Sequence, residues 1–133
     1  EVQAAQAFQL IGTALATLPP GRQLIIVGDM NSSPNDAPSS LPTPYMQFDA
    51  AGFFDVWNLR PGATPGMSCC QFENLSNKVS ALNQRIDLIY ALEMPRKVKD
   101  VRLLGEVAAD KTRPPGRGLW PSDHASVAGR LQY

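Results

Sequence analysis

The sequence predicts an α/β fold, an α+β sandwich in which helices pack on a sheet, as a single domain over residues 1–133. Three observations predict it. An amphipathic helical segment opens the chain, a short apolar run follows, and later segments alternate between apolar and polar residues. A helix, a strand, a second helix and then several strands form the order expected when helices cover a sheet.

The first predicted element is an amphipathic helix. Its apolar residues recur at helical spacing on one stripe: Ala4, Phe8, Ile11, Leu15 and Leu18. Pro19, Pro20 and Gly21 follow directly and should stop the helix. We therefore expect a helix whose stripe packs on a sheet.

The next predicted element is a strand, because residues 24–27 form a continuous apolar run of the kind buried on both faces of a sheet. Residues 31–44 contain four prolines and several Ser, Asn and Asp residues, so a loop is expected there. Residues 45–52 should form a short helix, with a short apolar element at residues 53–57.

Three further strands complete the prediction. Residues 84–92 should place Ile86, Leu88 and Tyr90 on one face, with Arg85, Asp87 and Ile89 on the other. Residues 97–107 also alternate. A connection rich in Pro and Gly, residues 111–121, leads to a closing strand in the last part of residues 122–133.

The composition is that of a globular protein with no bulk charge. Twelve basic residues balance twelve acidic ones, which argues against a broad surface for nucleic acid or an anionic membrane. The sequence contains no transmembrane segment and no signal-peptide pattern. We expect a soluble chain, either cytoplasmic or exported with its signal outside this chain. Because the first residue is Glu1, a processed or excised piece of a longer protein is also expected.

The two cysteines of the chain, Cys69 and Cys70, are adjacent. Neighbouring cysteines cannot close an ordinary structural loop, and a metal cage would need more ligands at wider spacing. We favour two small, partly buried side chains over a redox or metal-binding role. The redox compartment is left open.

Polar residues gather at the ends of the predicted strands. Asp29 and Asn31 follow the first strand, Asp87 lies in the second, and Asp123 and His124 precede the last. Each has an ordinary explanation when taken alone: a turn residue, an ion pair with a nearby arginine, or a packed histidine. Together they favour a functional site, because ligand sites in α/β proteins lie at strand ends.

The chemistry of these residue types points to a metal-assisted reaction on phosphate. A hard cation such as Mg²⁺ takes a few carboxylates, water and substrate phosphate, so Asp29 or Asp123 could help bind it. The amide of Asn31 could orient a water or a phosphate oxygen. A histidine held by a carboxylate, here His124 with Asp87, can transfer a proton or stabilise developing charge.

Three motifs resemble those of the endonuclease/exonuclease/phosphatase superfamily, which has the DNase I-like fold. "GDMNSSP" resembles its G-D-x-N-x-x-P motif, "RIDLIY" its R-I-D-[YL]-[IV] strand, and "SDHASV" its terminal S-D-H-x-x-V motif, in the same order. The resemblance implies a phosphoesterase that depends on Mg²⁺ or Mn²⁺. It implies that Asp29 positions or activates the attacking water, that Asn31 orients it, and that Asp123 contributes to the metal site. His124 would stabilise the transition state or act as acid or base, with Asp87 as its partner.

The resemblance covers the second half of that fold. It implies half of a four-layer α/β/β/α sandwich, with one mixed sheet and helices on one face. In the family, the first half supplies an Asn and the principal metal-binding Glu. The chain is then a fragment, a proteolytic remnant or half of a two-piece assembly, and alone it should bind Mg²⁺ poorly and turn over slowly or not at all.

An isolated half should also expose an apolar sheet face. We expect this face to bind the missing N-terminal half or a second copy of the chain. Candidates for it, or for the opposite helix-covered face, are Leu24, Ile26, Ile86, Leu88, Val101, Leu103 and Val127.

The alternative to a catalytic piece is a non-catalytic module that keeps the fold and binds a ligand or partner; a structural domain with accidental motifs is remote. The resemblance leaves the substrate open among nucleic acids, nucleotides and phospholipid headgroups. Trp120 would either stack on such a substrate or pack under the Pro-rich loop. Arg113, with Lys111 and Arg117, would either form a basic substrate patch or belong to a solvated loop.

Overall fold

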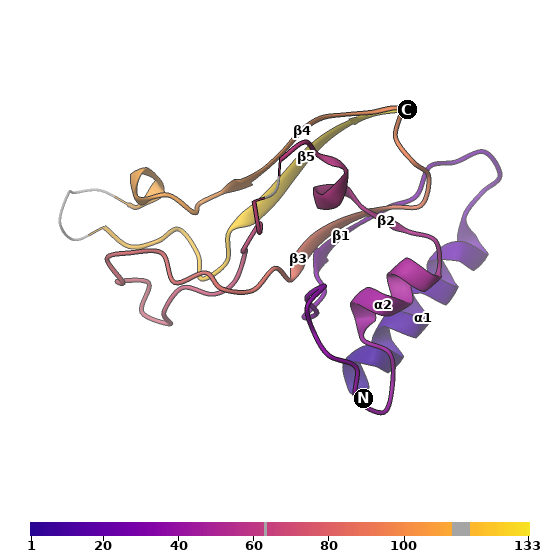
Figure 1. Cartoon of the computed structure of the whole chain (residues 1–133), viewed down its shortest axis with the longest axis horizontal. Coiled ribbons are helices and arrows are strands. Elements are labelled where there is room, and N and C mark those ends of the chain that lie inside the picture. Colours follow the sequence, from indigo (N-terminus) through magenta and orange to yellow (C-terminus); the bar gives the residue numbers. More distant parts are fainter. Residues whose placement is uncertain (63, 113–117) are drawn as a thin grey trace.

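The computed structural model describes residues 1–62, 64–112 and 118–133. Helices α1 and α2 lie side by side at one end of the molecule, and a long ribbon of β4 and β5 extends away from them (Figure 1). The elements in chain order are α1 Val2–Thr17, β1 Ile25–Asp29, α2 Pro44–Ala50, β2 Phe54–Asp55, the 3₁₀ turn η1 Val56–Leu59, β3 Asp87–Ala91, β4 Lys97–Leu104, the 3₁₀ turn η2 Ala108–Asp110 and β5 Ser126–Gln132.

The predicted α/β class is confirmed, but the strands form two sheets. One has the order β1-β3-β2, the other pairs β4 with β5, and every strand pair is antiparallel. The single mixed sheet expected from the sequence is therefore wrong. Strands β1 and β2 occupy both edges of β3, and β4 and β5 pair with each other in a separate sheet that packs on it.

The first core lies between the helices and the three-stranded sheet. Its buried members are Ala7, Ile11, Phe48, Phe53, Leu88 and Tyr90. The rings of Phe48 and Tyr90 stack with centroids 4.2 Å apart, and Phe53 meets Phe48 edge to face at 5.3 Å. Such aromatic contacts add to the stabilisation that burial of the rings already gives.

The predicted helix is present, but its buried stripe differs from the expected one. The buried residues are Ala4, Ala7 and Ile11, whereas Phe8 is 76% exposed. Small side chains on this stripe suit a face that packs against α2. The helix ends at Thr17, as the prolines that follow predict.

Strand β1 is not buried on both faces as the sequence predicts. Leu24 and Ile26 pack on the helix side, whereas Ile25 is 42% exposed and Val27 is 65% exposed. The strand lies at the edge of its sheet, and nothing among the described residues buries Val27 on the face away from the helices.

A second core joins the two sheets. It consists of Val56, Trp57, Ile89, Ala91 and Val101, with Val98, Leu103, Val127 and Leu131 packed against it. Strand β5 packs closely on β3 at Gly129. A Cβ atom added to this glycine would lie 3.1 Å from Ile89 Cδ1. Strand β3 is thus covered on both faces, and the alternation predicted for it holds.

The seven candidates for an open sheet face, or for the opposite helix-covered face, are covered on both sides of the sheet. They lie in the two cores or, for Ile86, are otherwise buried. The exposed apolar side chains of β1 are Ile25 and Val27. Within the described residues, no helix is both long and apolar enough to cross a membrane.

Candidate active site

Two aspartates face each other where β1 ends and β3 begins. Asp29 is the last residue of β1, Asp87 is the first of β3, and the antiparallel register pairs them directly. An antiparallel arrangement brings the end of one strand beside the start of its neighbour. This register therefore brings together two residues that are far apart in the sequence, where these two strands meet at one end of the sheet.

Asn31 holds the carboxylate of Asp29 in place. Its backbone N–H donates to Asp29 Oδ1 at 2.8 Å, and its side-chain Nδ2 donates to Asp29 Oδ2 at 3.2 Å. The backbone of Asn31 has a φ of 46°, in the left-handed region where Asn is one of the few favoured residues besides Gly. Both side chains are exposed, so the fixed carboxylate still faces solvent.

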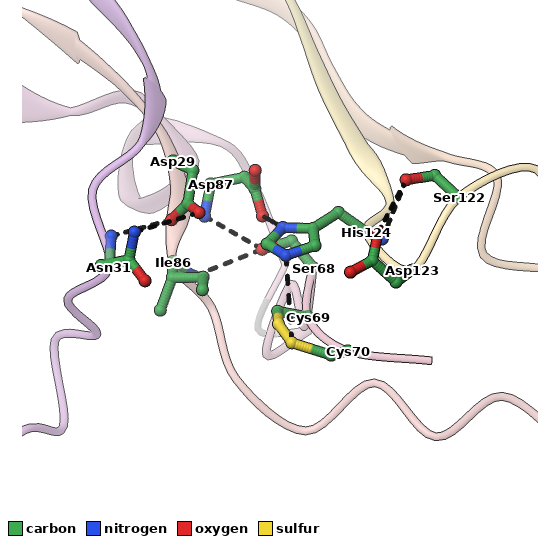
Figure 2. The surroundings of a disulfide bond; sticks show 10 residues. All are labelled: Asp29, Asn31, Ser68, Cys69, Cys70, Ile86, Asp87, Ser122, Asp123 and His124. Atoms are coloured by element: carbon green, nitrogen blue, oxygen red, sulfur yellow. Dashed lines mark hydrogen bonds and ion pairs between the residues drawn. A yellow bond between two sulfur atoms is a disulfide. The ribbon is translucent and has the colours of Figure 1, made fainter. Parts of the chain in front are cut away.

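His124 is held by Asp87. Its Nδ1 lies 2.8 Å from Asp87 Oδ2, which confirms the hydrogen bond expected from the sequence. The two side chains keep 26% and 20% of their surface exposed. If Nδ1 donates to the carboxylate, Nε2 is the nitrogen left free to act on a ligand. Figure 2 shows the imidazole beside Asp87, with Asp29 and Asn31 beyond it.

The charges around His124 raise its pKa above the ordinary value. Burial acts first and lowers the pKa, because it disfavours the charged imidazolium. The hydrogen bond to Asp87 and the negative charges of Asp87, Asp29 and Asp123 outweigh burial and favour the protonated form. The site thus holds a histidine that is readily protonated.

Ser68 was not singled out from the sequence, yet it ties the site together. It is fully buried, and its Oγ accepts the backbone N–H groups of Ile86 at 3.2 Å and Asp87 at 3.0 Å. Its carbonyl accepts the N–H of Ala125 at 2.8 Å. Ser68 thereby links the start of β3 to the residue after His124. No short motif signals such a contact between distant segments.

The sequence predicts two small, partly buried cysteine side chains without a redox or metal-binding role, whereas the structure joins them. Cys69 and Cys70 form a disulfide, with Cys69 buried and Cys70 exposed. Cys70 Sγ lies 3.9 Å from His124 Nε2, on the side of the ring opposite Asp87 (Figure 2). Among the described residues, one group of three or more His, Cys, Asp or Glu side chains is close enough to share an ion: Cys69, Cys70 and His124.

Asp123 lies apart from the Asp29 carboxylate. Its Oδ1 accepts from Ser122 Oγ at 3.2 Å, and Figure 2 shows it across His124 from Asp29. Oxygen donors are nevertheless present, because Asp29 is exposed and Mg²⁺ is commonly held by one or two carboxylates plus water. The donor set therefore fits part of a magnesium shell, with further ligands to come from elsewhere.

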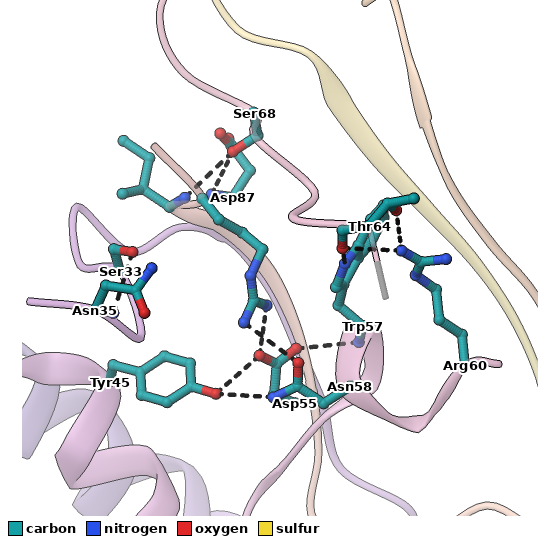
Figure 3. A network of polar contacts seen from close by, with 12 residues as sticks. Ser33, Asn35, Tyr45, Asp55, Trp57, Asn58, Arg60, Thr64, Ser68 and Asp87 are labelled. Atoms are coloured by element: carbon teal, nitrogen blue, oxygen red, sulfur yellow. Dashed lines mark hydrogen bonds and ion pairs between the residues drawn. The ribbon is translucent and has the colours of Figure 1, made fainter. Parts of the chain in front are cut away.

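Asp87 does not pair with Arg85, the ordinary alternative for a mid-strand aspartate. Arg85 Nη1 instead donates to Asp55 Oδ2 at 2.5 Å, and both side chains are buried. Asp55 also accepts from Tyr45 Oη at 3.0 Å and from the Trp57 N–H at 3.0 Å (Figure 3). This separate buried network leaves Asp87 free to hold His124.

Of the two predicted substrate residues, Trp120 packs inside the protein. It is 2% exposed, and its Nε1 donates to the carbonyl of Asn77 at 2.9 Å. Lys111 Nζ bonds to the same carbonyl at 2.6 Å and lies 4.8 Å from the indole centroid. The packing alternative therefore holds over stacking on a substrate. Arg113 and Arg117 lie outside the described residues.

Comparison with known proteins agrees with these motifs. The model of the endonuclease/exonuclease/phosphatase family matches residues 1–124. A solved endonuclease/exonuclease/phosphatase family protein from Leptotrichia buccalis C-1013-b aligns with a TM-score of 0.63 at 17% identity. The alignment covers 92% of this chain and 40% of that protein, which confirms a partial DNase I-like fold. A search among curated proteins finds no significant match.

Proposed function

Because the chain belongs to the endonuclease/exonuclease/phosphatase family, we propose that it forms the C-terminal catalytic part of a divalent-metal-dependent phosphoesterase. One observation carries the proposal. Asp29, which Asn31 holds, and Asp87, which holds His124, lie at directly opposed positions of neighbouring strands. The reaction is hydrolysis of a phosphodiester or phosphomonoester bond by an activated water, and the substrate is a nucleic acid, a nucleotide or a phospholipid headgroup.

Asp29 and Asn31 position the water. Each oxygen of Asp29 accepts one hydrogen bond from Asn31, so the carboxylate has a fixed direction and still has lone pairs to accept from water. A carboxylate held in this way can orient a water for attack and accept its proton.

His124 acts on the phosphate. Asp87 fixes the ring through Nδ1, and the raised pKa favours the imidazolium. A protonated Nε2 can donate to a phosphate oxygen as negative charge develops there, or give a proton to the leaving oxygen. The carboxylate of Asp87 stabilises the charged ring throughout.

Asp29 and Asp123 are the residues that would contribute to binding of Mg²⁺ or Mn²⁺. Such an ion, when bound, neutralises phosphate charge and makes a water easier to deprotonate. The chain spans 40% of the solved relative, so the remaining ligands belong to the rest of the fold. The chain alone is expected to turn over slowly or not at all.

A non-catalytic binding module is the second candidate. The observation in its favour is that no three carboxylates among the described residues lie close enough to share an ion. Activity in the completed fold decides between the two candidates.

The experiment measures hydrolysis of bis(p-nitrophenyl) phosphate by the chain together with the polypeptide that completes its fold. Activity should require Mg²⁺ or Mn²⁺ and disappear with a chelator. Asp29→Ala should lower the rate by about 10²–10⁴-fold, as expected for a group acting in the transition state. Asp49→Asn, which alters an exposed carboxylate on α2, is the control and should retain the wild-type rate. Full activity in the chelator would sink the metal-dependent proposal, whereas a completed fold without activity would favour the binding module.

The completing partner should bind the open side of β1. Val27 is 65% exposed there, and the missing half of the fold or a second copy of the chain would cover it. Val27→Lys should abolish this association, seen by light scattering, with a change in stability within about 0.5 kcal/mol because the side chain is exposed. Val79→Lys, at a loop valine that is 79% exposed, is the matched control. Equal association of the two variants would contradict this surface.

A further inference from the structure

The Cys69–Cys70 disulfide lies against the one ring nitrogen of His124 that Asp87 leaves free. Two sulfurs and Nε2 lie within 4.8 Å of one another, and Cys70 Sγ is 3.9 Å from Nε2. The proposed hydrolysis makes no use of either sulfur. In a tetrahedral zinc site, with Zn–S near 2.3 Å and Zn–N near 2.0–2.1 Å, the ligand atoms are roughly 3.5–3.8 Å apart. The imidazole and the exposed sulfur are already close to that spacing.

Asp87 orients the His124 ring so that Nε2 can bind a metal ion. A histidine that binds a metal through one nitrogen usually donates its other N–H to a carboxylate, which fixes the tautomer and strengthens the ligand. The Asp87 carboxylate, 2.8 Å from Nδ1, is in that position. It directs the lone pair of neutral Nε2 toward the sulfurs.

The cysteine segment is also anchored. The Cys69 N–H donates to the carbonyl of Gln84 at 3.0 Å, and the Cys69 carbonyl accepts from the N–H groups of Asn83 and Gln84 at 2.6 and 2.8 Å. Cys69 is buried while Cys70 is exposed, so solvent reaches one sulfur of a fixed pair. A reductant and a metal ion can therefore approach from the side of Cys70.

From this arrangement we propose that reduction of the disulfide creates a site for Zn²⁺ or a similar thiophilic divalent ion, formed by Cys69 Sγ, Cys70 Sγ and His124 Nε2. A dithiol reductant supplies two electrons and two protons; the S–S bond breaks, two S–H bonds form, and the reductant leaves as its own disulfide. On metal binding both thiols release their protons to solvent, the neutral imidazole donates its lone pair, and water takes the fourth position.

This site is chemically distinct from a magnesium site. Thiolate and imidazole ligands select Zn²⁺-type ions, whereas Mg²⁺ prefers carboxylate and water oxygens. The sequence has two cysteines and one histidine in total, so no other thiolate or imidazole competes within the chain. A bound thiophilic ion would also withdraw His124 from hydrolysis. That consequence rests on the proposed function, whereas the binding itself does not.

The test is a titration of the reduced chain with Co²⁺, followed by absorption after anaerobic removal of the reductant. One ion per chain should bind with a thiolate-to-cobalt charge-transfer band and strong tetrahedral d–d bands, and Zn²⁺ should displace it. The oxidised chain should show neither. Absence of the charge-transfer band in the reduced chain, or an ion that joins two chains as judged by light scattering, would overturn the site. Neither result depends on phosphoesterase activity.

Variants identify the ligands. Cys70→Ser, at an exposed position, should weaken Co²⁺ binding by roughly 100-fold or more, since even partners that only orient a ligand are worth about 10–100-fold in affinity. His124→Gln should weaken binding by a similar factor and alter the d–d bands, and Asp87→Asn should weaken it by about 10–100-fold. Asp49→Asn should bind as wild type, and circular dichroism checks that each variant is folded. Unchanged affinity in His124→Gln would refute the assignment.

Discussion

Two acid–base pairs flank the beginning of β3, and they differ in exposure. Asp55 and Arg85 keep 4% and 7% of their side-chain surface, and Tyr45 and Trp57 donate further hydrogen bonds to Asp55. Asp87 and His124 keep 20% and 26%, and Nε2 of the imidazole faces away from its partner. The first pair is enclosed by groups that satisfy it, whereas the second keeps part of its surface exposed and leaves Nε2 outside the hydrogen bond between the partners.

This difference assigns the pairs different roles. A buried ion pair whose remaining hydrogen-bonding atoms are satisfied holds elements in register, but it has no atom free for chemistry. Here it joins the segment before β3 to β2 and α2. A half-exposed pair contributes little to stability and retains a group that can be protonated. We therefore expect Asp55–Arg85 to stabilise the fold, whereas Asp87–His124 fits the proposed chemical role.

The largest expected difference is in stability. Asp55→Ala leaves Arg85 as an uncompensated buried charge and should lower the free energy of unfolding by about 3–5 kcal/mol. Asp87→Ala removes a half-exposed partner and should cost about 1 kcal/mol or less. Urea denaturation of both variants measures the two values. Equal losses of unfolding free energy in the two variants would contradict the different roles of the two pairs.

A smaller effect concerns protonation. The pKa of His124 should lie above the ordinary value near 6.5, and Asp87→Asn should lower it, because the variant loses the carboxylate's charge. NMR titration of the imidazole measures both. A pKa that is unchanged in Asp87→Asn would show that this carboxylate does not hold the proton.

The same shift fixes the sign of a pH effect on stability. The folded pKa of His124 is raised, so its contribution is fully present below the unfolded pKa and is lost as pH rises through the folded pKa. Urea denaturation on both sides of this window should show the loss in the wild type and a weaker one in Asp87→Asn.

The sequence pattern predicts the helices and strands well, because nearby residues determine where they end and which faces their side chains occupy. The prolines after residue 18 end α1, and the alternation along β3 places Leu88 and Tyr90 opposite Ile89. The sequence pattern predicts burial wrongly where residues distant in the sequence determine what covers a side chain. Val27 looks buried in the sequence, yet it is exposed because no described element covers its face of β1.

The same limit applies to the site. The motifs place Asp29, Asn31, Asp87 and His124 at strand ends, and the antiparallel register then brings them together. The roles of Ser68 and the cysteine pair could not be predicted, because they depend on contacts with residues that are distant in the sequence. Cys70 meets His124 across 54 positions, and no spacing rule for adjacent cysteines reports such a contact.

The most direct test of the central claim is the rate of phosphodiester hydrolysis by His124→Ala in the completed fold with Mg²⁺ or Mn²⁺. We expect a loss of about 10²–10⁴-fold with the chain still folded, because the variant removes the group proposed to donate to phosphate while the Asp55–Arg85 pair is untouched. Asp49→Asn, assayed beside it, should keep the wild-type rate. A wild-type rate for His124→Ala would contradict the claim that the exposed pair carries the chemistry.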